Sequence, residues 1–240
     1  MKNLLDLHTH TLASGHAYST LKENIQGAKE KGLAILGTSD HAKAMPGVTS
    51  NAFFSYYDAL PRHLEGVTLL CGVEANIIDY QGSLDIDLDK RKVDFAIVSL
   101  HMPCILPGSR EENTQALIGA LSHDRVKIVG HPDDSYFPLD YDRLVPVLVE
   151  RGIYAEVNNS SLKEGSPRKD SLKNLRTLLS LGRDQGLKIV MNSDAHFYTE
   201  VGNIEGSQAL VEAMDYPKDL ILNYSQSVQE VLDKLGIRDK

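Results

Sequence analysis

Short apolar runs alternate with amphipathic segments along most of the chain. The apolar runs are Leu4–Leu7, Leu33–Gly37, Val67–Gly72, Val93–Leu100, Val126–Val129, Ile153–Val157, Leu187–Met191 and, more weakly, Leu220–Leu222. Continuous apolar runs of roughly four to eight residues are typical of strands that are buried on both faces, as in a parallel sheet. We expect the first seven runs to be strands, and Leu220–Leu222 to be an appendage that leads into the last helix.

Between these runs, apolar residues recur at helical spacing. We expect helices over Leu21–Lys31, Asn113–Leu121, Tyr141–Arg151, Lys169–Gln185, Ser207–Met214 and Ser225–Leu235. Gly32, Gly152 and Gly186 each stand just before the next apolar run, where glycine commonly ends a helix. Strands that alternate with helices predict an α/β fold with a parallel sheet, and this number of units favours a closed (β/α) barrel over an open doubly wound sheet. No linker interrupts the pattern, so we expect residues 1–240 to form one domain.

The residues that follow the apolar runs form a second pattern, because histidines and acids are concentrated there. In chain order they are His8, His10, His16, Asp40, His41, Glu74, His101, His131, Asp194 and His196. In a (β/α) barrel the carboxyl ends of all strands meet at one rim, so we expect these side chains to converge. His63 and His123 lie in predicted helical stretches, and we interpret them as surface or helix-terminus histidines.

Imidazole and carboxylate groups in this arrangement indicate a metal centre for Zn²⁺, Mn²⁺ or Fe²⁺. His8 and His10 are two residues apart at a strand end and can chelate one ion, and Asp194 and His196 repeat that spacing. A catalytic zinc takes about three protein ligands, so this set predicts three ions with Glu74 as the bridge. Clustered cations clamp a phosphoryl group and hold a hydroxide that attacks phosphorus. We assign catalytic roles to Glu74, Asp194 and His196.

Charge and composition narrow the function further. Lysine and arginine number 25 and aspartate and glutamate 33, so the formal net charge is −8. Such a chain is not expected to bind nucleic acid through general electrostatics, although a nucleotide remains a candidate ligand. No apolar run approaches the roughly 18 residues of a membrane span, and the N-terminus lacks the apolar core of a signal peptide. Two isolated cysteines, Cys71 and Cys104, fit a reducing compartment, so we expect a cytoplasmic protein.

Taken together, the motifs resemble the PHP (polymerase and histidinol phosphatase) superfamily. The resemblance rests on Asp6-Leu7-His8-Thr9-His10, Ser39-Asp40-His41, Gly72-Val73-Glu74-Ala75-Asn76, His101, Gly130-His131-Pro132 and Asn192-Ser193-Asp194-Ala195-His196, and it spans residues 6 to about 200. The Glu-Ala-Asn trio and residues 158–161 look most like the bacterial YcdX-type phosphatases.

The resemblance implies a distorted (β/α)₇ barrel and a trinuclear centre that favours zinc, with manganese or iron in some members. It implies that one ion is held by His8, His10, Glu74 and Asp194, a second by Glu74, His101 and His131, and a third by His16, His41 and His196. Family members hydrolyse phosphomonoesters such as histidinol phosphate and nucleotide phosphates, or act as exonucleases associated with polymerases.

Four further residues are candidates for supporting roles. Arg168, in the loop after the sixth run, is the candidate phosphate clamp, and Ser14 is a candidate substrate contact or a support for a ligand. Asp6 and Asp40 are expected to orient histidine ligands from behind.

The leading hypothesis is a metal-dependent phosphatase that acts on a small phosphorylated metabolite. Histidinol-phosphatase-like, exonuclease or phosphodiesterase activity stays open, as does a metal-holding accessory domain without activity. An amidohydrolase-type barrel is also open, although such enzymes often carry a bridging lysine at a strand end and none stands at such a position here. The sequence leaves the physiological substrate, the native metal and the oligomeric state open.

Overall fold

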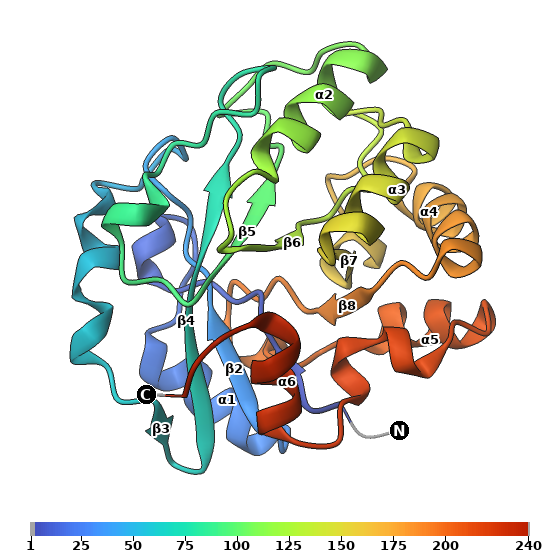
Figure 1. The fold of residues 1–240 in the computed structure, drawn as a ribbon. Helices are drawn as coiled ribbons and strands as arrows, with labels where there is room; N and C mark the ends of the chain where they lie inside the picture. Colours follow the sequence, from blue (N-terminus) through green and yellow to red (C-terminus); the bar gives the residue numbers. More distant parts are fainter. Residues whose placement is uncertain (1–2, 240) are drawn as a thin grey trace.

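Parallel strands form a nearly closed barrel in the computed structural model, which describes residues 3–239 (Figure 1). The strands, each paired in parallel with the next, are β1 (Leu5–Asp6), β2 (Ile35–Thr38), β4 (Val67–Asn76), β5 (Phe95–Ser99), β6 (Val126–Val129), β7 (Tyr154–Asn158) and β8 (Ile189–Asn192). A parallel bridge between Thr9 and Ala195 joins the chain after β1 to the chain after β8. The predicted distorted (β/α)₇ barrel is therefore confirmed.

Helices surround the barrel (Figure 1). They are α1 (Leu21–Glu30), α2 (Arg110–Ala120), α3 (Tyr141–Arg151), α4 (Ser171–Gln185), α5 (Glu205–Ala213) and α6 (Val228–Leu235). Each predicted helix is present. The helix α2 begins earlier than the apolar pattern suggests because Ser109 caps its first turn and Glu112 completes a capping box. No helix within residues 3–239 has both the length and the apolar character that crossing a membrane requires.

Three local predictions need correction. The strand β4 continues past Gly72 to Asn76, so Glu74 lies inside the strand rather than beyond its end. His63 belongs to a short strand, β3 (His63–Leu64), which pairs antiparallel with β4, whereas the sequence predicts a helix there. His123 lies in the turn after α2 rather than in the helix. The weak run Leu220–Leu222 is not a strand but falls within short 3₁₀ turns before α6, in agreement with its interpretation as an appendage.

The inside of the barrel changes character along its axis. Its apolar part takes side chains from every barrel strand and from α6, in the cluster Leu5, Leu7, Ile35, Leu70, Phe95, Ile97, Ile128, Tyr154, Val190, Leu222, Val231, Leu232, Leu235 and Ile237. A Cβ at Gly72 would lie 2.4 Å from Cζ of Phe95, so the glycine makes room for this ring. Alternate residues of a strand share a face. On β4 and β7, the residues at even spacing from Leu70 and Tyr154 therefore also point into the barrel, up to the carboxyl ends of the strands. There, Glu74 and Glu156 replace the apolar residues.

Candidate metal centre

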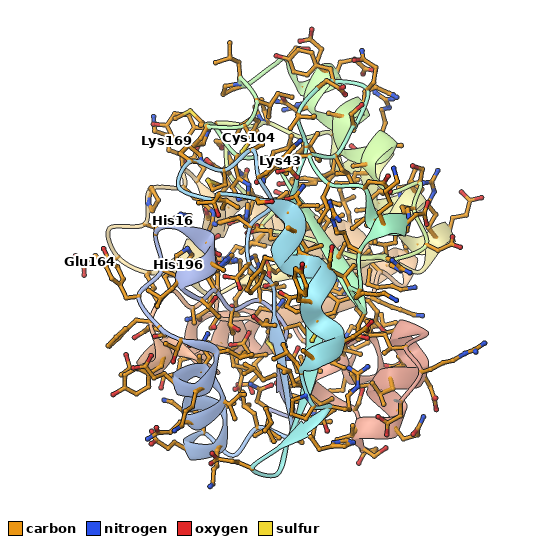
Figure 2. The ribbon with its side chains drawn as sticks, turned by 90° about the vertical axis from the view of Figure 1, so that its left-hand side faces the viewer. His16, Lys43, Cys104, Glu164, Lys169 and His196 are labelled. Atoms are coloured by element: carbon orange, nitrogen blue, oxygen red, sulfur yellow. The ribbon has the colours of Figure 1, made fainter. Side chains whose placement is uncertain are left out.

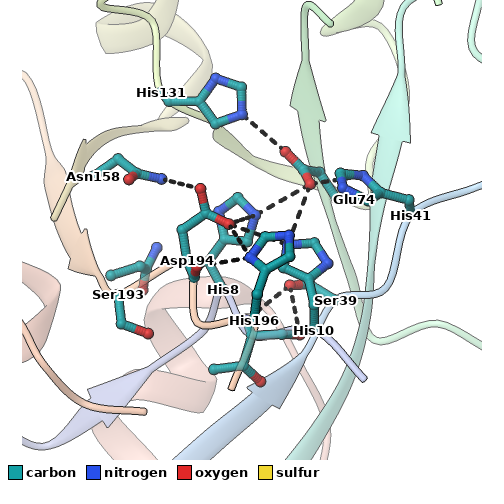
Figure 3. A network of polar contacts seen from close by, with 12 residues as sticks. His8, His10, Ser39, His41, Glu74, His131, Asn158, Ser193, Asp194 and His196 are labelled. Atoms are coloured by element: carbon teal, nitrogen blue, oxygen red, sulfur yellow. Dashed lines mark hydrogen bonds and ion pairs between the residues drawn. The ribbon is translucent and has the colours of Figure 1, made fainter. Parts of the chain in front are cut away.

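The carboxylate of Glu74 contacts several of the predicted ligands, and Figure 3 shows it between His131 and His41. Its Oε2 is 3.2 Å from Nε2 of His8 and 2.9 Å from Nδ1 of His41. Its Oε1 is instead 3.0 Å from Nε2 of His131 and 3.3 Å from Nε2 of His101. The two oxygens of one carboxylate therefore face two different sets of histidines, which is the arrangement that a bridging ligand requires.

Asp194 joins the cluster from the end of β8. Its Oδ1 is 3.2 Å from Nε2 of His10 and 3.6 Å from Nε2 of His8. Its Oδ2 accepts a hydrogen bond from Arg168 Nη2 at 2.9 Å. Asp194 thus connects His8 and His10 with Arg168, the candidate phosphate clamp.

His16 and His196 form the outer part of the cluster, and they lie beside each other in Figure 2. Their ring centroids are 4.9 Å apart, and the centroid of His16 is 5.0 Å from that of His41. His16 is exposed, whereas His8 and His10 are fully buried. The structure thus brings all nine predicted ligands into one site, while His63 and His123 lie elsewhere and contact Thr68 and Asp89.

The donor atoms fit divalent cations. Three buried ring nitrogens, His8 Nε2, His10 Nε2 and His41 Nδ1, have no well-aligned hydrogen-bond partner within residues 3–239. Buried polar atoms are normally satisfied, so these nitrogens are free to serve as metal ligands. In three groups the ligand atoms all lie within 4.8 Å of one another: His8 with His10 and Asp194, His41 with Glu74 and His101, and His10 with His41 and His196.

The charges of the cluster are strongly coupled. Burial alone would raise the pKa of Glu74 and Asp194, but neighbouring histidines, and for Asp194 also Arg168, hold both pKa values well below their usual range. Burial would lower the pKa of His8, but the carboxylates of Glu156, Glu74 and Asp194 hold it well above its usual value. Burial lowers the pKa of His101 to about 4. The site therefore keeps its carboxylates ionised and attracts positive charge to its centre.

Several rings are held from behind by a second polar group. His8 Nδ1 is 2.8 Å from Glu156 Oε1, and His101 Nδ1 is 2.9 Å from Asn76 Oδ1. His10 Nδ1 is 2.9 Å from the hydroxyl oxygen of Ser14. Because each partner oxygen can accept a hydrogen bond, the Nδ1 atoms can donate and the Nε2 atoms are left facing the centre.

Ser14 lies behind the ring of His10, with its hydroxyl in a buried network of hydrogen bonds. Ser14 is fully buried, and its hydroxyl donates to Asp40 Oδ1 at 2.7 Å while accepting from the backbone N–H of His41 at 3.2 Å. These contacts are those of a support for the His10 ring, and a contact of Ser14 with substrate stays a prediction. Asp40 acts on His10 only through Ser14, and Asp40 also accepts a hydrogen bond from the backbone N–H of Thr11 at 2.7 Å.

Asp6 does not touch a histidine ring. Its carboxylate accepts hydrogen bonds from the backbone N–H groups of His8, Ser193 and Gly202, at 3.3, 3.2 and 2.8 Å. Burial raises the pKa of Asp6 despite these hydrogen bonds. Asp6 thus ties the backbone after β1 to the backbone after β8, which differs from the predicted contact with a ligand ring.

Two of the predicted ligands occupy the left-handed region of backbone conformation. The φ angles are 29° for His131 and 55° for Asp194. Left-handed conformations cost of order 1–3 kcal/mol for residues other than glycine and tend to persist at functional sites. Each is the second residue after a strand, β6 for His131 and β8 for Asp194, so the unusual conformation occurs where the chain leaves the barrel at the rim.

Sequence reasoning missed Glu156, which is completely buried on β7. Its neighbours Tyr154 and Asn158 share its face of the strand. The signal was present in the sequence: an acid interrupts the otherwise apolar run Ile153–Val157. A carboxylate is almost never fully buried unless it is paired, so an acid inside a buried strand points to a cation or a histidine beside it.

A cavity of about 470 Å³ opens onto the cluster. Glu74, Asp194 and His196 line one part of it. Its lining also includes the largely apolar side chains of Leu100, Met102, Pro103, Tyr136, Phe137 and Pro167. Arg168 also lines the cavity, and its Nη1 is 3.2 Å from the hydroxyl of Ser161. The cavity can therefore hold a small molecule with an anionic end at the histidines and an apolar body against these apolar side chains.

Comparison with known proteins gives consistent matches. The sequence profile of the PHP domain matches residues 6–160. A probable phosphatase of Clostridium novyi is 42% identical over 93% of this chain and 91% of its own length. A probable phosphatase of Clostridium acetobutylicum is 41% identical over 100% of this chain and 97% of its own length.

Solved structures add a match of the fold. A histidinol phosphate phosphatase from Lactococcus lactis, crystallised with zinc, L-histidinol and phosphate, superposes with a TM-score of 0.64 at 13% identity. The match covers 90% of this chain and 95% of that protein. At this identity the likeness is one of fold, whereas the clostridial relatives also share the sequence.

Proposed function

The chain belongs to the PHP domain family and is a phosphatase, and from this premise we propose that its histidine-rich rim holds three divalent cations and hydrolyses a small phosphomonoester. The observation that carries the proposal is the position of Glu74, whose two oxygens face different histidines. Cations held at the rim would supply a nucleophile at neutral pH and neutralise the charge of a phosphoryl group.

The ligands divide into three proposed sets. His8, His10, Glu74 and Asp194 would hold one ion, Glu74, His101 and His131 a second, and His16, His41 and His196 a third. The compact group of His8, His10 and Asp194 supports the first set directly. His10 also lies close to His41 and His196, so the first and third sets are neighbours. We propose zinc as the metal, with manganese and iron as alternatives, because imidazole and carboxylate ligands suit all three.

We assign Arg168 to the phosphate of the substrate. Its guanidinium lies in the cavity wall, hydrogen bonded to Asp194 and Ser161. A guanidinium stays charged at any physiological pH and presents a planar fork that matches two phosphate oxygens. Burial lowers the pKa of Arg168, but Asp194 and Asp133 outweigh it and raise the pKa. Arg168 is thus a fixed positive group beside the place where the phosphate would lie.

The proposed substrate is a small molecule rather than a nucleic-acid strand. Among the described residues that line the cavity, Arg168 is the only lysine or arginine. A polynucleotide site needs a basic track along several phosphates, and the chain carries a net charge of −8. An apolar wall beside a single cationic contact suits one phosphate group attached to a compact body.

A substrate panel on protein of measured metal content tests this proposal. The panel is p-nitrophenyl phosphate, bis(p-nitrophenyl) phosphate, a labelled oligonucleotide, an amide and a lactone. We expect hydrolysis of the monoester, little or none of the other substrates, and loss of activity after chelation that zinc or manganese restores. Hydrolysis that survives complete metal removal would contradict the metal-dependent mechanism. Preference for the diester, oligonucleotide or amide would favour the corresponding alternative activity.

A further inference from the structure

We infer that Glu156 is a positioning residue that fixes the ring of His8 for metal binding and ties four strand ends together beneath the site. The inference rests on the proposed metal centre. Glu156 is not among the nine predicted ligands, and it lies on β7. It is fully buried.

Glu156 makes four hydrogen bonds, two to each oxygen. Its Oε1 is 2.8 Å from His8 Nδ1 and accepts from Asn192 Nδ2 at 2.8 Å. Its Oε2 accepts from the backbone N–H of His131 at 2.8 Å and from Asn158 Nδ2 at 3.0 Å. These partners come from the ends of four different strands: β1, β6, β7 and β8. Three of the partners are N–H groups that can only donate, and an ionised carboxylate satisfies the whole set when His8 Nδ1 carries a proton.

The first of these contacts determines which nitrogen of His8 can bind a metal. Because an ionised carboxylate only accepts, the proton of His8 must lie on Nδ1. The lone pair of neutral His8 is then on Nε2, which points to Glu74 Oε2 at 3.2 Å and to Asp194 Oδ1 at 3.6 Å. A glutamine at position 156 could turn its amide toward Nδ1, and the ring would then carry its proton on Nε2, where it blocks metal binding.

The other contacts extend the support to further ligands. The bond to the backbone of His131 holds a residue whose φ angle of 29° is strained. Asn158, held by Glu156, also donates to Asp194 Oδ2 at 3.2 Å. Asn192, held by the other oxygen, accepts from the backbone N–H of Leu7 at 2.9 Å, just before His8. One carboxylate therefore places side chains or backbone at three proposed ligands.

The test compares Glu156→Gln with Glu156→Asp and with a matched control, Asp94→Asn. Asp94 is also a buried carboxylate, but it pairs with Arg62 at 2.7 Å and accepts from the backbone of Cys71, away from the metal centre. Partners of metal ligands are typically worth about 10–100-fold in metal affinity. We expect E156Q to weaken zinc binding by about that factor, E156D to recover part of it, and D94N to bind zinc as the wild type does.

Two readouts other than activity decide the outcome. Zinc affinity is measured by competition with a chromophoric chelator, and the ring ¹⁵N–¹H signals are recorded by NMR and assigned with a His8→Gln variant. We expect a hydrogen-bonded Nδ1–H signal from His8 in the wild type and in D94N that is lost or shifted in E156Q. Zinc affinity of folded E156Q within twofold of the wild type, or absence of the signal from the wild type, would overturn the inference.

The same data separate this inference from the proposed function. If the wild type binds no zinc, the proposed metal centre fails. The Nδ1–H signal of His8, present in the wild type and altered in E156Q, would still support the positioning role of Glu156. If E156Q does not fold, E156D keeps the charge with a shorter reach and provides the same two readouts. Wild-type affinity and an unchanged ring signal in E156D would then count against the inference.

Discussion

The two ends of the barrel are built from the same strands but from opposite kinds of residue. At the amino-terminal end, apolar side chains such as Phe95 and Tyr154 pack together and α6 closes over them. At the carboxyl-terminal end, carboxylates and imidazoles occupy the interior, and several ring nitrogens have no aligned partner in residues 3–239. The change happens within single strands, as between Gly72 and Glu74 on β4.

This contrast shows how the molecule divides its tasks. Burial of apolar surface stabilises the fold by about 25 cal/mol per Å². This burial is concentrated around the outside of the strands and at the amino-terminal end of the barrel interior, which we call the floor. Buried polar groups instead cost free energy unless each is paired. The rim collects such groups in quantity, so the floor must supply the stability that allows the rim to carry chemistry.

Glu74→Gln changes only the rim, and we expect it to have the largest effect on activity. It removes the negative charge that both sets of histidines face, so we expect turnover of p-nitrophenyl phosphate to fall by at least ~10³-fold, which is about 4 kcal/mol of transition-state stabilisation. Steady-state kinetics together with metal analysis measure this. Turnover within tenfold of the wild type at full metal content would show that Glu74 does not bridge.

Phe95→Ala is the opposite experiment, because it disturbs the floor and leaves the rim in place. The ring is completely buried against Gly72, and its removal leaves a cavity that should cost ~3–5 kcal/mol in the free energy of unfolding. Urea denaturation measures the loss. We expect zinc affinity and turnover per folded molecule to stay within about twofold. A large loss of zinc affinity in folded protein would mean that the two ends are not independent.

Arg168→Ala tests which task this side chain performs at the rim. If it binds the phosphate, kcat/KM should fall about 10–100-fold, as expected for a charge-assisted hydrogen bond worth about 1.5–3 kcal/mol, and inhibition by inorganic phosphate should weaken. Lys169→Ala is the control, because Lys169 instead lies over the ring of Tyr136. Loss of metal content in R168A with unchanged phosphate inhibition would indicate that Arg168 mainly holds Asp194.

Tyr154 gives the floor a pH dependence of its own. Burial raises the pKa of this phenol to about 12. The unfolded chain loses the proton near pH 10, so between pH 10 and 12 the unfolded state binds fewer protons and the free energy of unfolding falls as pH rises. The contribution approaches about 3 kcal/mol. Tyr154→Phe should therefore lose less stability than the wild type over this interval. Parallel denaturation curves for the two proteins would contradict this assignment.

The strands and helices could be predicted from the sequence because each follows from a local pattern. The helix α3 (Tyr141–Arg151) and the strand β6 (Val126–Val129) have the predicted boundaries. The helix begins and ends as predicted because Asp140 caps its first turn and Gly152 ends it. The short antiparallel strand at His63 could not be predicted in this way, because two residues carry no periodicity and the pairing with β4 determines their conformation.

In the site, too, the features that follow from local sequence could be predicted and those that depend on tertiary packing could not. The convergence of the nine predicted ligands could be expected because each lies near the carboxyl end of a recognisable strand or in the loop that follows it, and the strands of a barrel end at one rim. The partners behind the rings depend on which side chain lies behind which, and this is set by tertiary packing. Thus Asp6, which is two residues from His8, accepts hydrogen bonds from the backbone of His8 and from the backbone and hydroxyl of Ser193, whereas Glu156 from a distant strand contacts the His8 ring.

The most direct test of the account is a crystal structure of the zinc-loaded protein with anomalous data collected on both sides of the zinc edge. We predict three anomalous peaks at the rim, each about 2.0–2.2 Å from nitrogen and oxygen atoms of its ligands, with Glu74 binding two of the ions through separate oxygens. Fewer than three peaks in fully loaded crystals, or Glu74 bound to one ion only, would contradict the trinuclear centre.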